Sequence, residues 1–209
     1  MQSPKGQREK IMRKFLQPLT VLVYLCASLT ATAQTRGFGE LQSATPKAFK
    51  SLTVDSYLTH KLDSHWSVSS FFLTTAGWAE AYAGPEWSPT DWMTLGLSVG
   101  MEQGVEGFDL RTAYSLWLGH DKVSFLGIVE AGKVAYSGDD SALWYDLALK
   151  YKVLPYLTIG LKDRRPSGVG PLAEVTVGKA TLWASWAPLA SEKAKFDPKN
   201  SLFGVKFSF

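Results

Sequence analysis

The feature that most constrains the fold is an alternation of apolar and polar residues that recurs along the chain from residue 36 onward. In residues 92–102 (WMTLGLSVGME), every second residue from Met93 to Met101 is apolar, and the residues between them are Thr, Gly, Ser and Gly. Side chains point alternately to the two faces of a β-strand. Because helical periodicity is almost absent from this part of the chain, the pattern predicts an all-β protein.

Twelve such segments follow one another, separated by Gly, Pro, Asp and Ser. Several have about the 9 to 11 residues that a tilted strand needs to cross a membrane. The pair Phe71-Phe72 breaks the alternation after Ser69-Ser70 and suggests a bulge there. Ten or eight strands are the alternatives. The predicted strands are 36–44, 49–62, 66–75, 78–87, 92–103, 108–119, 123–137, 143–153, 156–164, 171–178, 180–187 and 201–209.

Residues 1–33 have the form of a cleaved export signal. Basic residues precede an apolar run from Leu19 to Leu29, and Ala31-Thr32-Ala33 then forms a small-x-small cleavage site. The run of about 11 residues is shorter than the roughly 20 that a membrane-spanning helix needs. We therefore expect a signal peptide over 1–33 and a single domain over 34–209.

The signal peptide accounts for the basic character of the whole chain. The chain has 22 Lys and Arg against 19 Asp and Glu, and residues 1–33 hold five of these bases and one of the acids. The remaining 17 bases and 18 acids give a net charge of −1, which predicts no nucleic-acid partner. The one cysteine, Cys26, also lies in the signal, so the exported domain has no disulfide.

The last predicted strand is strongly apolar on one face, whereas chain ends are usually polar and frayed. It reads Gly204-Val205-Lys206-Phe207-Ser208-Phe209. This segment resembles the C-terminal signal of Gram-negative outer-membrane β-barrels, Gly-x-x-aromatic-x-aromatic. The resemblance implies that Gly204, Phe207 and Phe209 are an assembly signal. It also implies a location in the cell outer membrane, with membrane lipid, lipopolysaccharide and the barrel-assembly machinery as partners.

The connections agree with such a barrel. The second, fourth, sixth, eighth and tenth are tight, whereas long ones such as 137–142 and 188–200 are odd-numbered. Bacterial outer-membrane barrels have an even number of strands, short periplasmic turns and longer external loops. The predicted architecture is a single antiparallel up-and-down transmembrane β-barrel of about twelve strands with both termini periplasmic.

Alternation alone does not decide which face points inward, and a soluble lipocalin-like barrel would reverse the two faces. Charges are nearly absent from the apolar faces away from strand ends. Trp66, Trp87 and Trp92 fall near the turn ends of their strands and Trp186 near a loop end, as aromatic girdles do. These features favour apolar faces that meet lipid and polar faces that enclose a lumen.

An enzyme of the outer leaflet is one alternative, because some small outer-membrane barrels that resemble this chain modify lipids with Ser/His-type sites. The three histidines, His60, His65 and His120, map instead to the periplasmic end. No Gly-x-Ser-x-Gly motif and no metal-ligand spacing is present. The pair Asp139-Asp140 in a loop is read as solvated. We therefore predict no enzyme activity, no metal site and no cofactor.

The charges of the polar faces are unevenly distributed. Acids dominate the first seven strands (Asp55 and Glu86 among them), and bases dominate the last five, so closure places an acidic wall opposite a basic one. This arrangement resembles the transverse field of general porins. The residues expected to line the lumen are Glu80, Glu102, Asp109, Arg111, Glu130, Asp146, Lys150, Lys152, Lys162, Arg164, Glu174 and Lys206.

The predicted function is a narrow, weakly selective channel for small hydrophilic solutes. A barrel of eight strands is filled by side chains and one of sixteen holds an aqueous channel, so twelve strands leave a narrow pore or a filled lumen. A closed barrel with a structural or surface-interaction role is therefore the main alternative. Twelve-stranded porins for acidic sugars resemble this chain in size, but their strongly basic lumens differ from the mixed charge here.

Overall fold

The computed structural model describes an all-β protein over residues 34–45, 52–104, 107–132, 143–190 and 195–209. The predicted signal peptide and Asp139-Asp140 lie outside the described residues. Within those ranges, no helix has the length and the apolar character to cross a membrane.

Most strands in the described ranges are long. Twelve of them have seven or more residues, and two more, β12 and β13, have two residues each. Their bounds are β1 Thr35–Thr45, β2 Thr53–Lys61, β3 Trp66–Thr75, β4 Trp78–Thr90, β5 Met93–Gly104, β6 Gly107–His120, β7 Val123–Gly132, β8 Leu143–Leu154, β9 Leu157–Arg164, β10 Gly168–Val177, β11 Ala180–Trp186, β12 Leu189–Ala190, β13 Lys195–Phe196 and β14 Ser201–Ser208.

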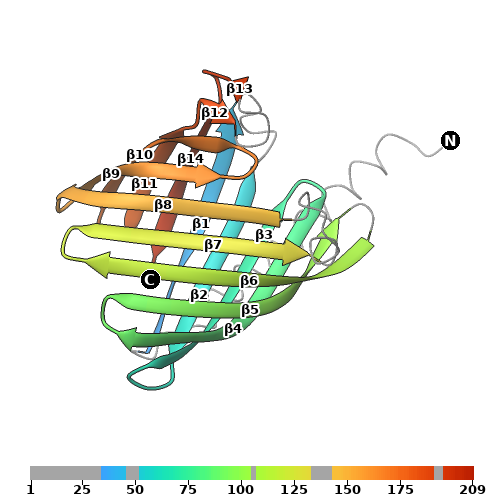
Figure 1. Cartoon of the computed structure of the whole chain (residues 1–209), viewed down its shortest axis with the longest axis vertical. Helices are drawn as coiled ribbons and strands as arrows, with labels where there is room; N and C mark the ends of the chain where they lie inside the picture. Colours follow the sequence, from blue (N-terminus) through green and yellow to red (C-terminus); the bar gives the residue numbers. More distant parts are fainter. Residues whose placement is uncertain (1–33, 46–51, 105–106, 133–142, 191–194) are drawn as a thin grey trace. The chain divides into compact units, whose positions relative to one another are not determined.

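The twelve long strands close into one barrel. Each strand from β1 to β11 lies beside the next in the chain, and Figure 1 shows β4 to β9 in this order across the near wall. The C-terminal strand β14 completes the circle, because it pairs antiparallel with β11 on one side and with β1 on the other. The short strands β12 and β13 pair with each other in the connection between β11 and β14. The predicted twelve-stranded up-and-down barrel is confirmed.

Most strand bounds agree with the sequence patterns to within a few residues, but the expected bulge in residues 66–75 is wrong. Strand β3 pairs without a register shift with both β2 and β4. The irregularities lie instead between Trp87 and Thr90 and between Lys152 and Leu154, close to the tight turns. A bulge interrupts the pairing of two strands and bends the bulged strand. In this barrel both bends lie next to a turn.

The turn between β2 and β3 shows why these connections can be short. The Asp63 side chain accepts hydrogen bonds from the backbone N–H groups of His65 (2.7 Å) and Trp66 (2.8 Å). These two donors, which favour the ionised carboxylate, lower the pKa of Asp63. An aspartate that bonds its own turn in this way lets the chain reverse within four residues.

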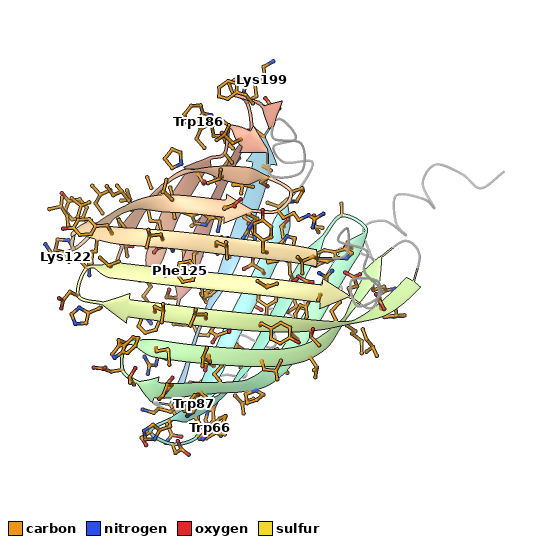
Figure 2. All side chains as sticks on the ribbon, viewed as in Figure 1. Trp66, Trp87, Lys122, Phe125, Trp186 and Lys199 are labelled. Atoms are coloured by element: carbon orange, nitrogen blue, oxygen red, sulfur yellow. The ribbon has the colours of Figure 1, made fainter. Side chains whose placement is uncertain are left out.

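Burial runs opposite to that of a soluble protein. Leu97, Val99 and Leu110 are 48%, 65% and 71% exposed, whereas Asp55 and Glu130 are each 3% exposed. Figure 2 shows Phe125 on the outer wall of the barrel, with Trp66 and Trp87 together at the turn end of their strands. The apolar faces of the strands therefore point outward and the charged faces point inward, which excludes the lipocalin-like arrangement.

Candidate functional site

The lumen contains an internal cavity of about 200 Å³. All twelve long strands contribute to its wall, so the cavity belongs to the barrel as a whole rather than to one hairpin. Its lining combines carboxylates, bases and aromatic rings. The charged lining residues are Glu40, Asp55, Glu86, Glu130, Asp146, Lys150, Lys162, Arg164, Glu174 and Lys206.

One polar cluster joins strands β4 to β7 toward their loop ends, and we call it the Tyr82 cluster; it comprises Glu80, Tyr82, Glu102, Arg111 and Glu130. Arg111 donates to Glu102 at 2.5 Å and lies 3.5 Å from Glu130. The hydroxyl of Tyr82 lies 2.9 Å from a carboxylate oxygen of Glu80 and 3.1 Å from one of Glu130. Because β4 and β7 are separated by two strands in the sheet, Tyr82 reaches across the inner face of β5 and β6. The inward glycine Gly100 leaves room for its ring, since a Cβ there would lie 2.8 Å from Tyr82 Cδ1.

A second cluster is centred on Asp146 of β8. One of its carboxylate oxygens accepts a hydrogen bond from Lys162 at 2.5 Å, and the other accepts two from the guanidinium of Arg164, of which the Nε bond measures 2.7 Å. The guanidinium carbon of Arg164 lies 5.5 Å from the ring centroid of Trp144, which is within cation–π range. Two bases therefore share one acid here, and the ring of Trp144 packs beside one of them.

A chain of hydrogen bonds connects this cluster with the opposite wall. Arg164 Nη1 donates to Gln42 Oε1, and Gln42 Nε2 donates to Asp55 Oδ2 at 2.5 Å. Three strands, β10, β11 and β14, separate β9 from β1 around the barrel. The side chains therefore form a chord through the lumen rather than a contact between neighbouring strands. We call Arg164, Gln42 and Asp55 the lumen chord.

Two further acids of the lumen accept hydrogen bonds from neutral side chains. Tyr57 donates to Glu86, and Thr59 donates to the same carboxylate at 2.9 Å. The indole of Trp183 donates to Glu40 at 2.6 Å.

On the other side of the lumen, Lys150 pairs with Glu174 at 2.6 Å. Lys206 has its ammonium group 5.4 Å from the ring of Phe38.

The twelve predicted lumen residues lie in different surroundings. Glu130, Asp146, Lys150, Lys162, Arg164, Glu174 and Lys206 line the cavity. Glu80, Glu102 and Arg111 lie in the Tyr82 cluster instead, and Lys152 is exposed beside a tight turn. Asp109, paired in register with Glu102, lies near the loop end of β6.

The ion pairs of the described lumen form within each predicted wall. Arg111 pairs with acids of its own half of the sheet, and Lys150, Lys162 and Arg164 pair with Glu174 or Asp146 in the other half. Among the described residues, the hydrogen bonds that join the two halves inside the lumen pass through neutral groups, namely Gln42 and Trp183.

Several lumen residues were missed from sequence. Gln42, Tyr57, Tyr82 and Trp183 occupy inward positions and hold the carboxylates. The inward parity of Tyr57 and Tyr82 was readable, because they share strand faces with Asp55 and Glu80. No predicted lumen charge lies in residues 36–44 or 180–187, so nothing of that kind marked Gln42 and Trp183. The sequence prediction selected lumen residues by formal charge. It therefore omitted these four residues, because amides, phenols and indoles carry no formal charge.

The histidines do not form a catalytic group. His65 and His120 lie at tight turns, and His60 is an exposed residue near the turn end of β2. Across the described ranges, no group of three or more His, Cys, Asp or Glu residues is placed to hold a metal ion.

Comparison with known proteins shows what this architecture is similar to. No family model and no curated protein matches the sequence. Among solved structures, the NanC porin is 11% identical over 84% of this chain and 98% of its own, with a TM-score of 0.50. The KdgM porin in complex with disordered oligogalacturonate is 10% identical over 83% and 99%, with a TM-score of 0.52. The fold is that of a small porin-like barrel.

A further similar structure comes from work on the in-meso crystallization of membrane proteins. It is 13% identical over 83% of both chains, with a TM-score of 0.57. The structural similarity supports the porin-like fold. The sequence identities are too low to indicate which solutes the lumen admits.

Proposed function

We propose that this protein is an outer-membrane β-barrel that forms a narrow, weakly selective channel for small hydrophilic solutes. The observation that carries the proposal is the internal cavity of about 200 Å³, to which all twelve strands contribute charged or polar and aromatic side chains. A cavity needs roughly 10 to 15 Å³ to hold one water molecule, so this one has space for on the order of ten.

The outer surface supports a membrane location. Large apolar side chains such as Val99, Leu110 and Leu182 are 65%, 71% and 59% exposed. A soluble barrel would lose the stabilisation of burying these faces, whereas lipid covers them without cost. A closed barrel also leaves no unpaired strand edge in the bilayer.

The lumen charges support water inside the barrel. Buried charges are tolerated only when they are paired or hydrated. Glu40, Asp55 and Glu86 line the cavity, and the hydrogen bonds described above come to them from Trp183, Gln42, Tyr57 and Thr59, which are all neutral. A hydrated lumen would supply further hydrogen bonds to these three carboxylates.

The experiment that tests the proposal is single-channel recording of the purified protein in planar lipid bilayers. We expect discrete conductance steps, smaller than those of sixteen-stranded porins because the lumen is narrower. Absence of steps from correctly folded protein would overturn the channel.

A closed barrel with a structural or surface-interaction role is the second candidate. It is favoured by the Tyr82 cluster and the lumen chord, in which side chains of non-adjacent strands bond one another across the lumen. Under this reading the charges stabilise the barrel from within, and their neutralisation lowers the unfolding free energy without any effect on permeability.

We propose no enzymatic activity. The histidines lie at the turn end, whereas the barrels that modify lipids carry out their chemistry near the outer leaflet. Release of fatty acid from lipopolysaccharide or phospholipid vesicles by the purified protein would contradict this.

A further inference from the structure

The lumen chord joins the walls formed by β9 and by β1 and β2 through the barrel interior. Arg164 is the last residue of β9 and Gln42 lies near the loop end of β1, so the chord crosses the lumen in its loop-end part. A solute that enters from the loop end and passes toward the turns must therefore pass beside these side chains or displace them.

Arg164 is held firmly on its own wall. Asp146 accepts two hydrogen bonds from its guanidinium, and Trp144 covers one side of it. Such charge-assisted, two-pronged contacts fix the orientation of an arginine more tightly than a single hydrogen bond does. The fixed guanidinium presents its remaining donor, Nη1, toward Gln42.

Gln42 is the neutral member of the chord. It is a neutral side chain with several rotatable bonds, and its carbonyl accepts from a cation while its amino group donates to an anion. The amide therefore occupies a gap with a positive group on one side and a carboxylate on the other. The gap is as wide as one amide group with its two hydrogen bonds.

Resting on the proposed channel function, we infer that the lumen chord is the constriction of the pore and favours small zwitterionic solutes, with free α-amino acids as the chemical class. The carboxylate of such a solute takes the place of Gln42 Oε1 on Arg164, and its ammonium group takes the place of Gln42 Nε2 on Asp55. Both hydrogen bonds lost when Gln42 swings away are thereby replaced by charge-assisted ones.

The same geometry disfavours other solutes of equal size. A neutral solute replaces the amide with uncharged hydrogen bonds, which are roughly half as strong. A simple anion meets the Asp55 carboxylate and a simple cation meets the Arg164 guanidinium, so each gains one attraction together with one repulsion. Glu40 and Lys206 also line the cavity, but they are paired in register on the adjacent strands β1 and β14 and lie on the same wall.

The test is a liposome-swelling assay with two isomers of one formula, glycine, which is zwitterionic at neutral pH, and glycolamide, which is neutral. Swelling of protein-free liposomes is subtracted for each solute. We expect glycine to enter at least about threefold faster than glycolamide, because two charged hydrogen bonds replace two neutral ones. Equal rates through an open pore would overturn the inference and leave the channel proposal intact.

Variants assign the preference to the chord. Asp55→Asn removes the anionic end and leaves the Arg164–Asp146 pair intact, so the glycine preference should fall to about onefold while glycolamide still enters. Arg164→Gln removes the cationic end, and the glycine preference should again fall to about onefold. Gln42→Ala removes the neutral bridge but keeps both charges, so both solutes should enter faster with the preference retained. Lys122→Gln, at the exposed turn between β6 and β7, is the matched charge control and should change neither rate.

Each variant is first shown to be folded by its altered gel mobility without boiling. A preference that survives in both Asp55→Asn and Arg164→Gln would show that it arises elsewhere in the lumen and would overturn the assignment. If neither solute enters through the wild-type protein, the channel proposal itself fails and the inference falls with it.

Discussion

At the scale of single residues, adjacent positions of one strand meet opposite surroundings. Leu97 and Ser98 lie together in β5, but Leu97 is 48% exposed on the outer surface and Ser98 lines the cavity. We expect Leu97→Arg to lower the unfolding free energy by about 2 to 4 kcal/mol, because it places a charge in the lipid core. Ser98→Arg should cost less, since the cavity is polar. Urea unfolding in lipid vesicles measures both, and the reverse order of costs would contradict the assigned faces.

Two glycines offer a second comparison at this scale. A Cβ on Gly100 would lie 2.0 Å from the carbonyl oxygen of Ala81, a backbone atom that cannot move aside, whereas a Cβ on Gly39 meets nothing within 4 Å. Gly100→Ala should therefore destabilise the barrel by about 1 to 3 kcal/mol through overpacking. Gly39→Ala is the control and should leave the unfolding free energy nearly unchanged. Equal effects of the two substitutions would show that β5 adjusts more freely than its neighbours indicate.

At the scale of the element, β14 is the strand that closes the barrel, between β11 and β1. Its end is fixed by two backbone hydrogen bonds between Phe209 and Gly37, of 3.0 and 3.1 Å. The rings of Phe207 and Phe209 remain 53% and 40% exposed, so packing within the barrel does not account for their size.

We expect Phe209→Ala to reduce the amount of folded protein in the outer membrane while export into the periplasm continues. The backbone hydrogen bonds survive this substitution, so the loss reports on the ring as an assembly signal. Phe209→Tyr keeps the aromatic ring and is the matched control. Immunoblots of outer-membrane and periplasmic fractions give the measurement. Normal abundance of the alanine variant would mean that the ring is dispensable for assembly.

At the scale of the whole molecule, closure of the sheet predicts a cooperative barrel that resists detergent. Unboiled protein should migrate differently from boiled protein on a denaturing gel, and its circular dichroism should be rich in β-structure. A protein recovered in the periplasmic fraction without detergent, with no change in mobility on boiling, would contradict the membrane barrel.

The distribution of charge gives a second prediction at this scale. Replacing Lys150, Lys162 and Arg164 with glutamine should shift ion selectivity toward cations, because the acids that remain dominate the potential in the lumen. The reversal potential in a salt gradient measures the shift.

Neutralising acids should shift the selectivity toward anions, and by different amounts. The cavity-lining set Glu40, Asp55 and Glu86 should act more strongly than Glu80, Glu102 and Asp109, which are not among the cavity-lining residues. Equal shifts in reversal potential for the two sets of acids would show that permeating ions pass close to both sets.

The sequence by itself determined the local features of this protein. The period of two in apolar residues identified the strands and separated their two faces, because neighbouring side chains of a strand must point to opposite sides. The tight turns were also readable, since turn residues such as Asp63 bond their own backbone. Twelve strands with alternating short and long connections then predicted an up-and-down barrel.

Only the tertiary structure decided which inward side chains meet. Arg164 and Gln42 lie 122 residues apart and come together because the closed sheet makes β9 and β1 face the same lumen. Which side chains meet across the lumen depends on the register of every strand pair around the barrel. A local sequence pattern does not contain this information. The sequence therefore predicted opposed acidic and basic walls, whereas closure placed the ion pairs within each wall and left Gln42, an uncharged residue, to join them across the lumen.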